Sequence, residues 1–211
     1  MKIDKLVFSP IEVNTYIISE GSGDCAIIDC GCYSSEEREK LVSFLEKNDL
    51  NPVMLLNTHL HLDHLFGNGF LKQRYGLLTH ASPHDEYNRA SAVRHAIMFG
   101  LEMEEPPVMG TELSDRQRLT LGALSFETVF VPGHTTGSMA FYFPQEDCIF
   151  TGDALFAGSI GRTDLPGGDF NTLMESIRER LLTLPDDIVV YPGHGPATTI
   201  GEERRTNSFL I

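Results

Sequence analysis

Residues 53–64 read VMLLNTHLHLDH and join a short apolar run to a dense group of imidazole and carboxylate side chains. The apolar part, residues 53–57, predicts a buried strand that leads directly into the histidines. Alternate residues of an extended segment share a face, so His59 and His61 can bind one cation together. Asp63 and His64 then lie at the turn into the next helix, from which they can reach a second cation nearby.

Three more turns carry a residue of the same kind directly after a predicted strand. His134 lies in VPGHTTGS (131–138), Asp153 in FTGD (150–153) and His194 in VYPGHGP (190–196). Glycine in each turn lets the backbone bend sharply and lets a metal approach closely. Imidazoles with carboxylates suit borderline metals such as zinc, iron or manganese. The sequence therefore predicts a metal site built from His59, His61, Asp63, His64, His134, Asp153 and His194.

The rest of the chain alternates strands and helices in an order that occurs twice. We expect strands at residues 5–8, 13–19, 25–29 and 53–57, with a helix at 36–47 that Ser34 or Ser35 caps. Residues 83–99 have helical composition. The second half predicts β-structure at 119–131, 137–143, 148–151 and 187–191, an amphipathic helix at 172–184 and a short helix at 201–207. Two sheets packed face to face with helices outside would bury this α/β pattern, within one domain over residues 1–211.

Composition excludes several other classes of protein. The 30 acidic and 16 basic residues leave a net charge of −14, which argues against nucleic acid and anionic membranes as partners. We find no apolar run of membrane-spanning length and no signal-peptide pattern. The four cysteines form no C-x-x-C pair, so a zinc ribbon is excluded, and we expect reduced thiols in a cytoplasmic protein.

With these motifs the chain resembles the metallo-β-lactamase fold superfamily along nearly its whole length. The segments GHTTGS, TGDALF, GSIGRTD and PGHGP make it most similar to the glyoxalase II-like hydrolases. The resemblance implies a four-layer αββα sandwich of two mixed sheets. It implies two divalent metal ions, with zinc as our first choice and iron or manganese as alternatives. It further implies that one metal is bound by His59, His61 and His134, the other by Asp63, His64 and His194, and that Asp153 bridges them.

The same resemblance implies the reaction. A hydroxide shared by the two metals would attack a thioester, such as an S-(2-hydroxyacyl)glutathione, while Asp63 orients it as the catalytic carboxylate. The chain resembles the short branch of this group, which has no C-terminal helical substrate domain. Two further residues are candidates for supporting roles in the site because of their positions in the sequence. Arg162 could bind a substrate carboxylate or pair with Asp164 or Asp169, and Asp29 could orient a ligand imidazole or be a plain turn residue.

Several alternatives remain open from sequence. Persulfide dioxygenases of the same superfamily are similar in pattern and use a single iron, bound by residues that match His59, His134 and Asp153. A lactone hydrolase would need the same machinery, and a protein with an inactive site could serve as a binding module. We expect the segment between His64 and His134 to shape the substrate pocket. Residues 98–109 are apolar enough to cover the site or to pair subunits, and the oligomeric state is open.

Overall fold

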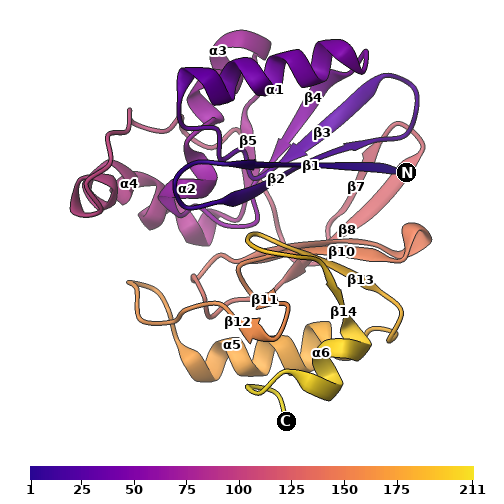
Figure 1. Cartoon of the computed structure of the whole chain (residues 1–211). Helices are drawn as coiled ribbons and strands as arrows, with labels where there is room; N and C mark the ends of the chain where they lie inside the picture. The colour runs from indigo at the N-terminus through magenta and orange to yellow at the C-terminus, as the bar shows by residue number, and fades with distance from the viewer.

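Two six-stranded β-sheets stack face to face at the centre of the computed structural model, which describes residues 1–211 (Figure 1). The first sheet has the order β1-β2-β3-β4-β5-β6. Its strands are β1 (Lys2–Phe8), β2 (Val13–Ser19), β3 (Asp24–Ile28), β4 (Asn51–Leu56), β5 (Thr79–Ala81) and β6 (Thr111–Glu112). The first three strands pair antiparallel and the last three continue in parallel, so the sheet is mixed.

The second sheet is also mixed and has the order β14-β13-β10-β9-β8-β7. Its strands are β7 (Arg118–Leu121), β8 (Leu124–Phe130), β9 (Met139–Phe143), β10 (Cys148–Gly152), β13 (Val189–Pro192) and β14 (Thr198–Thr199). Only β10 and β13 pair in parallel. A separate small hairpin joins β11 (Leu155–Phe156) to β12 (Ser159–Ile160).

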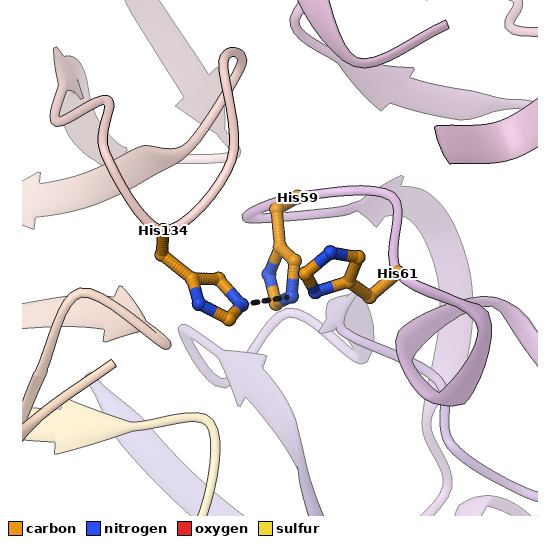
Figure 2. A group of neighbouring side chains, drawn as sticks. All are labelled: His59, His61 and His134. Carbon is orange, nitrogen blue, oxygen red and sulfur yellow. Dashed lines mark hydrogen bonds between the residues drawn. The ribbon is translucent and has the colours of Figure 1, made fainter. Parts of the chain in front are cut away.

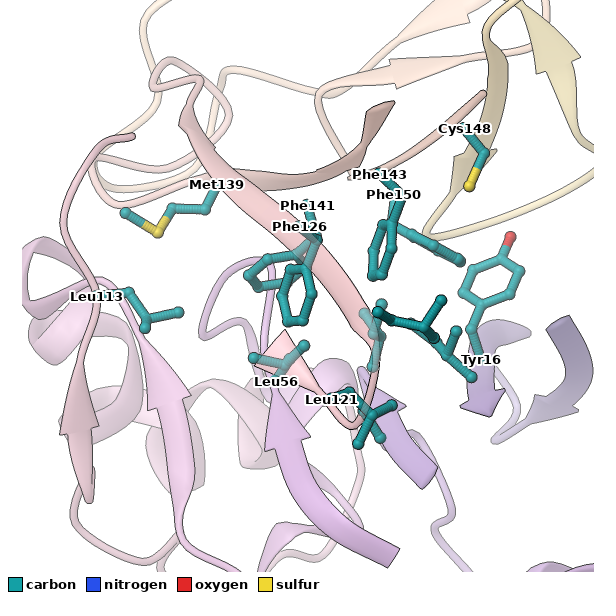
Figure 3. Close-up of a cluster of buried hydrophobic side chains, with 14 residues drawn as sticks. Tyr16, Leu56, Leu113, Leu121, Phe126, Met139, Phe141, Phe143, Cys148 and Phe150 are labelled. Atoms are coloured by element: carbon teal, nitrogen blue, oxygen red, sulfur yellow. The ribbon is translucent and has the colours of Figure 1, made fainter. Parts of the chain in front are cut away.

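A buried aromatic cluster holds the two sheets together (Figure 3). Phe126 and Phe143 stack with ring centroids 4.5 Å apart, and Phe150 packs edge-on against Tyr16 of the first sheet at 5.0 Å. Offset and edge-to-face contacts of this kind are the favoured packing of aromatic rings. Because strand side chains alternate between faces, the same strands present a second apolar face outward.

Helices cover those outer faces and complete four layers. Helix α1 (Ser35–Lys47) and helix α3 (Asn68–Tyr75) pack Leu41, Leu45 and Leu71 on the first sheet. Helix α5 (Phe170–Ser176) packs Leu173 on the second sheet, close to the short helix α6 (Ile200–Thr206). The predicted αββα sandwich of two mixed sheets is confirmed.

The local signals for helix α1 act as expected. The side chain of Ser34 accepts a hydrogen bond from the backbone N–H of Glu37, whose carboxylate accepts one from the backbone of Ser34. This reciprocal capping box ends the uncertainty between Ser34 and Ser35 in favour of Ser34.

Other elements differ from the expectation, each for a physical reason. The β-structure expected at 119–131 is present as two strands, because Gly122 adopts φ +56° and closes a tight hairpin between β7 and β8. Helix α5 starts at Phe170, since Asp169 caps it, and its last turn, Ile177–Leu181, widens to a π-helix. Residues 83–99 divide into a 3₁₀ turn (Pro83–Asp85) and helix α4 (Glu86–Met98). The helix expected after His64 is divided into helix α2 and helix α3, whose bounds were not predicted, and strand β5, with only three residues, was not predicted.

Candidate metal centre

Three imidazoles from two separate loops meet at one end of the sandwich. His59 and His61 lie in the loop between β4 and helix α2 (Leu62–Leu65), and His134 lies in the loop after β8. Figure 2 shows the rings of these three residues facing one another, with the Nε2 atoms of His59 and His134 3.3 Å apart. All three side chains are buried. One ligand atom from each lies within 4.8 Å of the others, which is close enough to surround a single cation.

Hydrogen bonds to the far side of two of these rings set their tautomers. Nδ1 of His134 donates to the carbonyl of Arg162 at 2.8 Å, because a carbonyl can only accept. The hydroxyl of Thr58 donates to Asp29 at 2.7 Å, so the same oxygen accepts from Nδ1 of His59 at 3.1 Å. Both Nε2 atoms are therefore lone-pair donors that face each other. Two such atoms repel unless a cation shares them, which is the arrangement expected of metal ligands.

A second group of ligand atoms lies beside the first. Asp63 and His64 come from helix α2, and His194 comes from the loop after β13. An oxygen of Asp63 lies 3.4 Å from Nε2 of His194 and 3.8 Å from Nε2 of His64. Nδ1 of His194 donates to the carbonyl of Glu12 at 3.2 Å, which again leaves Nε2 for a ligand.

Asp153 lies between the two groups, directly after β10. Its Oδ2 atom is 3.7 Å from Nε2 of His134 and 3.6 Å from Nε2 of His194, and its Oδ1 atom is 3.5 Å from Nε2 of His64. The carboxylate thus reaches both groups at once. The structure brings all seven predicted metal ligands together in the arrangement that the family resemblance implies.

The carboxylates make this region favourable for positive charge. Burial opposes protonation of His64, but Asp29, Asp63 and Asp153 outweigh it and hold its pKa well above the usual range. Burial likewise opposes protonation of His194, and its hydrogen bond to Asp63 with the charge of Asp153 still raises its pKa. Burial lowers the pKa of His61 to about 3, so that imidazole is neutral near pH 7. The site therefore combines the neutral imidazole of His61 with carboxylates whose negative charge favours bound cations.

Unpaired buried atoms give an independent test of the fit. Nε2 of His64 and Oδ1 of Asp153 are both buried and have no hydrogen-bond partner. Leaving a buried polar atom unpaired costs about 1–3 kcal/mol, more when it is charged. A cation between these atoms would satisfy both. The residues present therefore fit two divalent metal ions.

Glycine is required at position 193 by close approach. A Cβ atom there would meet Oδ1 of Asp153 and lie 2.9 Å from Cε1 of His64. Any larger residue at position 193 would displace the carboxylate that reaches both groups of ligands. The PGHGP segment thus positions His194 and also leaves room for Asp153.

The two candidates outside the ligand set have different contacts. Asp29 adopts φ +53° and accepts from the backbone N–H of Thr58 at 2.8 Å, while its Oδ2 lies 3.1 Å from Nδ1 of His64 as an ion pair rather than a linear hydrogen bond. It therefore touches the ring of one ligand and holds the loop that carries another. Arg162 binds Asp164 through two hydrogen bonds of 2.8 Å, so its guanidinium is paired within its own loop.

Asp85 is a residue of the site that sequence analysis missed. Its buried carboxylate accepts from the backbone N–H of Leu60 at 2.9 Å, from the hydroxyl of Thr135 at 2.9 Å and from the backbone N–H of Gly137 at 2.7 Å. Leu60 lies between His59 and His61, and Thr135 follows His134. Asp85 thus ties together the two loops that form the first group of ligands. The only signal nearby in the sequence was the helix start at Ser82 and Pro83, and that signal predicts only a cap.

Replacing Asp85 by alanine is expected to lower both stability and metal binding. The change leaves two buried N–H groups unpaired, at about 1–3 kcal/mol each, and frees the two loops to separate. We expect the thermal midpoint to fall by roughly 10 °C, and metal content per chain to fall with it. Asp187→Ala, an exposed aspartate whose side chain makes no hydrogen bond, is the control. An Asp85→Ala protein with unchanged midpoint and full metal content would contradict this assignment.

Five of the seven predicted ligands line the floor of a pocket of about 630 Å³, namely His61, Asp63, His134, Asp153 and His194. Helix α4 and the residues just after it provide one wall, with Tyr87, Arg94, Met98 and Phe99 among the lining residues. The expectation that the segment between His64 and His134 shapes the pocket thus has a structural counterpart in helix α4. Met103 and Met109 pack instead against the cluster beneath helix α4. No helix in the structure is both long enough and apolar enough to span a membrane.

Comparison with known proteins places the chain in a family. The model of the metallo-beta-lactamase superfamily matches residues 9–194. The hydroxyacylglutathione hydrolase GloC of Haemophilus influenzae is 40% identical over all of this chain and 98% of its own length. A probable metallo-hydrolase of Bacillus subtilis, YqgX, is 34% identical over all of this chain and 98% of its own length.

Solved structures agree with this placement. TTHA1623, solved in a di-iron-bound form, superimposes with a TM-score of 0.90 at 37% identity, over 98% of this chain and all of its own. ETHE1 from Myxococcus xanthus superimposes with a TM-score of 0.80 at 29% identity, over 99% of this chain and 84% of its own. Together with the two-sheet sandwich and the seven clustered ligand residues, these matches show that the chain belongs to the metallo-beta-lactamase superfamily, as a glyoxalase II-like member.

Proposed function

We propose that this protein is a metal-dependent thioesterase that hydrolyses an S-(2-hydroxyacyl)glutathione-like substrate. The observation that carries the proposal is the position of Asp153 between two complete groups of ligands, at the floor of a pocket. The 40% identity to a hydroxyacylglutathione hydrolase supports the choice of substrate. Helix α4 forms one wall of that pocket and would contact the substrate.

The residues of the site would share the work of hydrolysis. His59, His61 and His134 would hold one divalent cation, and Asp63, His64 and His194 the other, with Asp153 touching both. Bound there, the cations would lower the pKa of a shared water and polarise the thioester carbonyl. Asp63, 13% exposed and beside His194, is placed to orient that water and to take its proton. The apolar pocket wall would exclude bulk water from the carbonyl, which strengthens every electrostatic interaction in the site.

A second candidate is a mononuclear-iron persulfide dioxygenase. The likeness to ETHE1 over nearly the whole chain supports it. The family resemblance implies that its single iron would be held by His59, His134 and Asp153, which are also ligands in the thioesterase proposal. A third candidate function is hydrolysis of a lactone, which would use the same site. The dioxygenase differs from the two hydrolases in metal content and oxygen use, and the two hydrolases differ from each other in the substrate that they prefer.

Metal analysis of the purified protein, with anaerobic assay of S-lactoylglutathione, tests the proposal. About two metals per chain and hydrolysis without oxygen would support the thioesterase. One iron per chain, no hydrolysis, and oxygen uptake with glutathione persulfide would replace it with the dioxygenase. A lactone turned over in preference to the thioester would select the third candidate.

Zinc is our proposed metal, although the relative TTHA1623 was solved with two irons. The ligand set of imidazoles and carboxylates suits zinc, iron and manganese alike, so the same metal analysis identifies it. For location we propose the cytoplasm. All four cysteines are free and buried, and Sγ of Cys30 lies 3.4 Å from Sγ of Cys32 without a disulfide, which supports a reducing compartment.

A further inference from the structure

The pocket over the metal centre has one unpaired cation at its mouth. Arg94 and Arg162 are the arginines that line it, and the only acidic residues there are the proposed ligands Asp63 and Asp153. Arg162 is neutralised by its two hydrogen bonds to Asp164. Arg94 makes no ion pair: its Nη2 atom donates only to the hydroxyls of Tyr87 and Ser91, each at 3.2 Å. In a chain of net charge −14, a guanidinium that lines a pocket without an acidic partner is suited to bind an anionic ligand.

Tyr87 supplies a second donor beside this guanidinium. Its hydroxyl accepts from Arg94, which leaves its own proton free to donate. The two residues are seven positions apart on helix α4, so they share one face of that helix. His95 adds no charge, because burial, and then the charge of Arg94, lower its pKa. A guanidinium and a phenol on one helix face match the two oxygens of a carboxylate.

Exposure indicates which part of a substrate would reach this pair. His61 and His134 are buried and line the floor of the pocket, whereas Arg94 is exposed and Tyr87 is 54% exposed at its mouth. The carbonyl under attack must lie at the floor. The small acyl group stays near it, and the thiol carrier extends towards solvent along the apolar wall that Met98 and Phe99 provide.

We infer that Arg94 and Tyr87 form an anion subsite that binds a carboxylate of the thiol carrier. The inference rests on the proposed thioesterase function and deepens it, because it names the residues that would recognise the anionic carrier. Arg94 would act in binding rather than in the chemical step. It takes the role of carboxylate recognition that sequence alone suggested for Arg162.

Two substrates with the same acyl group and different carriers test the subsite. S-lactoylglutathione has free carboxylates on its carrier, whereas S-lactoyl-N-acetylcysteamine has an uncharged carrier. For Arg94→Gln we expect KM to rise about tenfold with the anionic carrier, at nearly unchanged kcat. With the uncharged carrier, kcat/KM should match the wild type. Arg94→Lys should recover part of the loss, and Tyr87→Phe should show a smaller effect of the same kind.

The control is Arg178→Gln, another exposed helical arginine without an ion pair, on the helix that covers the far side of the second sheet. It should leave both substrates unaffected. Added salt should raise the wild-type KM for the anionic carrier and leave that of Arg94→Gln nearly constant, since exposed charges are screened.

Three outcomes have distinct meanings. An equal loss of kcat/KM on both carriers in Arg94→Gln would show a structural role and overturn the inference. No change on either carrier would overturn it as well, while the thioesterase itself stands. A wild-type protein that hydrolyses neither thioester, although fully loaded with metal, would instead overturn the proposed function.

Discussion

Replacing Asp153 by asparagine is expected to lower thioester hydrolysis by on the order of a thousandfold and to reduce the metal content per chain. The side chain lies 3.5 Å from Nε2 of His64, 3.7 Å from that of His134 and 3.6 Å from that of His194. Asparagine preserves the shape of the side chain but removes the charge shared by both groups of ligands. A neutral amide cannot offset the charge of two divalent cations, so we expect the protein to lose both cations together.

The measurement combines kcat/KM for S-lactoylglutathione with metal analysis of the same preparation. Asp147→Asn is a matched control, because Asp147 precedes the same strand, β10, at its opposite end and is exposed. It should retain full activity and metal content. Near wild-type hydrolysis in a well-folded Asp153→Asn protein would rule out a shared role for this carboxylate.

Removing the metals is expected to abolish hydrolysis and to lower thermal stability. Metal bound at a thousandfold excess over its dissociation constant contributes about 4 kcal/mol to the folded state. For a domain of this size, that corresponds to a fall in the thermal midpoint of roughly 10 °C on chelation. The Asp153→Asn protein, already poor in metal, should show little further change with chelator. A midpoint that does not respond to chelator in the wild type would argue against metal at this site.

The fall in the thermal midpoint on chelation should also depend on pH. In the metal-free protein, nearby carboxylates raise the pKa of His64 and of His194, so each imidazole keeps its proton to a higher pH than a free histidine does. A raised pKa in the folded state stabilises it at low pH, and this contribution is lost as pH rises through that pKa. Metal must displace these protons, so its affinity grows with pH. We therefore expect a larger fall at about pH 8 than at about pH 6, which scanning calorimetry with and without chelator can measure. The opposite order would contradict this assignment.

The local elements of the fold follow from local signals. Ser34 and Glu37 form the capping box of helix α1 through atoms three residues apart. The strands that precede the ligands are short apolar runs. A strand that is buried on both faces can be recognised from its apolar composition, without knowing which strands pair with it. Where an element depends on distant packing, prediction from sequence fails. Helix α3 has a weak apolar face of its own, and it is held by Leu71 against the first sheet.

The seven predicted ligands and their places at strand ends can be read from local patterns, because His59, His61, Asp63 and His64 follow one another within six residues and the other three lie in glycine-flanked turns. The layered fold can be read in the same way, since alternating strand and helix patterns must bury their apolar faces against one another. The contacts between residues far apart in the chain depend on tertiary packing. Asp85 binds loops 25 and 50 residues away, and Arg94 reaches the pocket because helix α4 packs over helix α2. Charge pairing depends on distance in space rather than on position in the chain, which is why the structure assigns Arg162 to Asp164 and leaves Arg94 free.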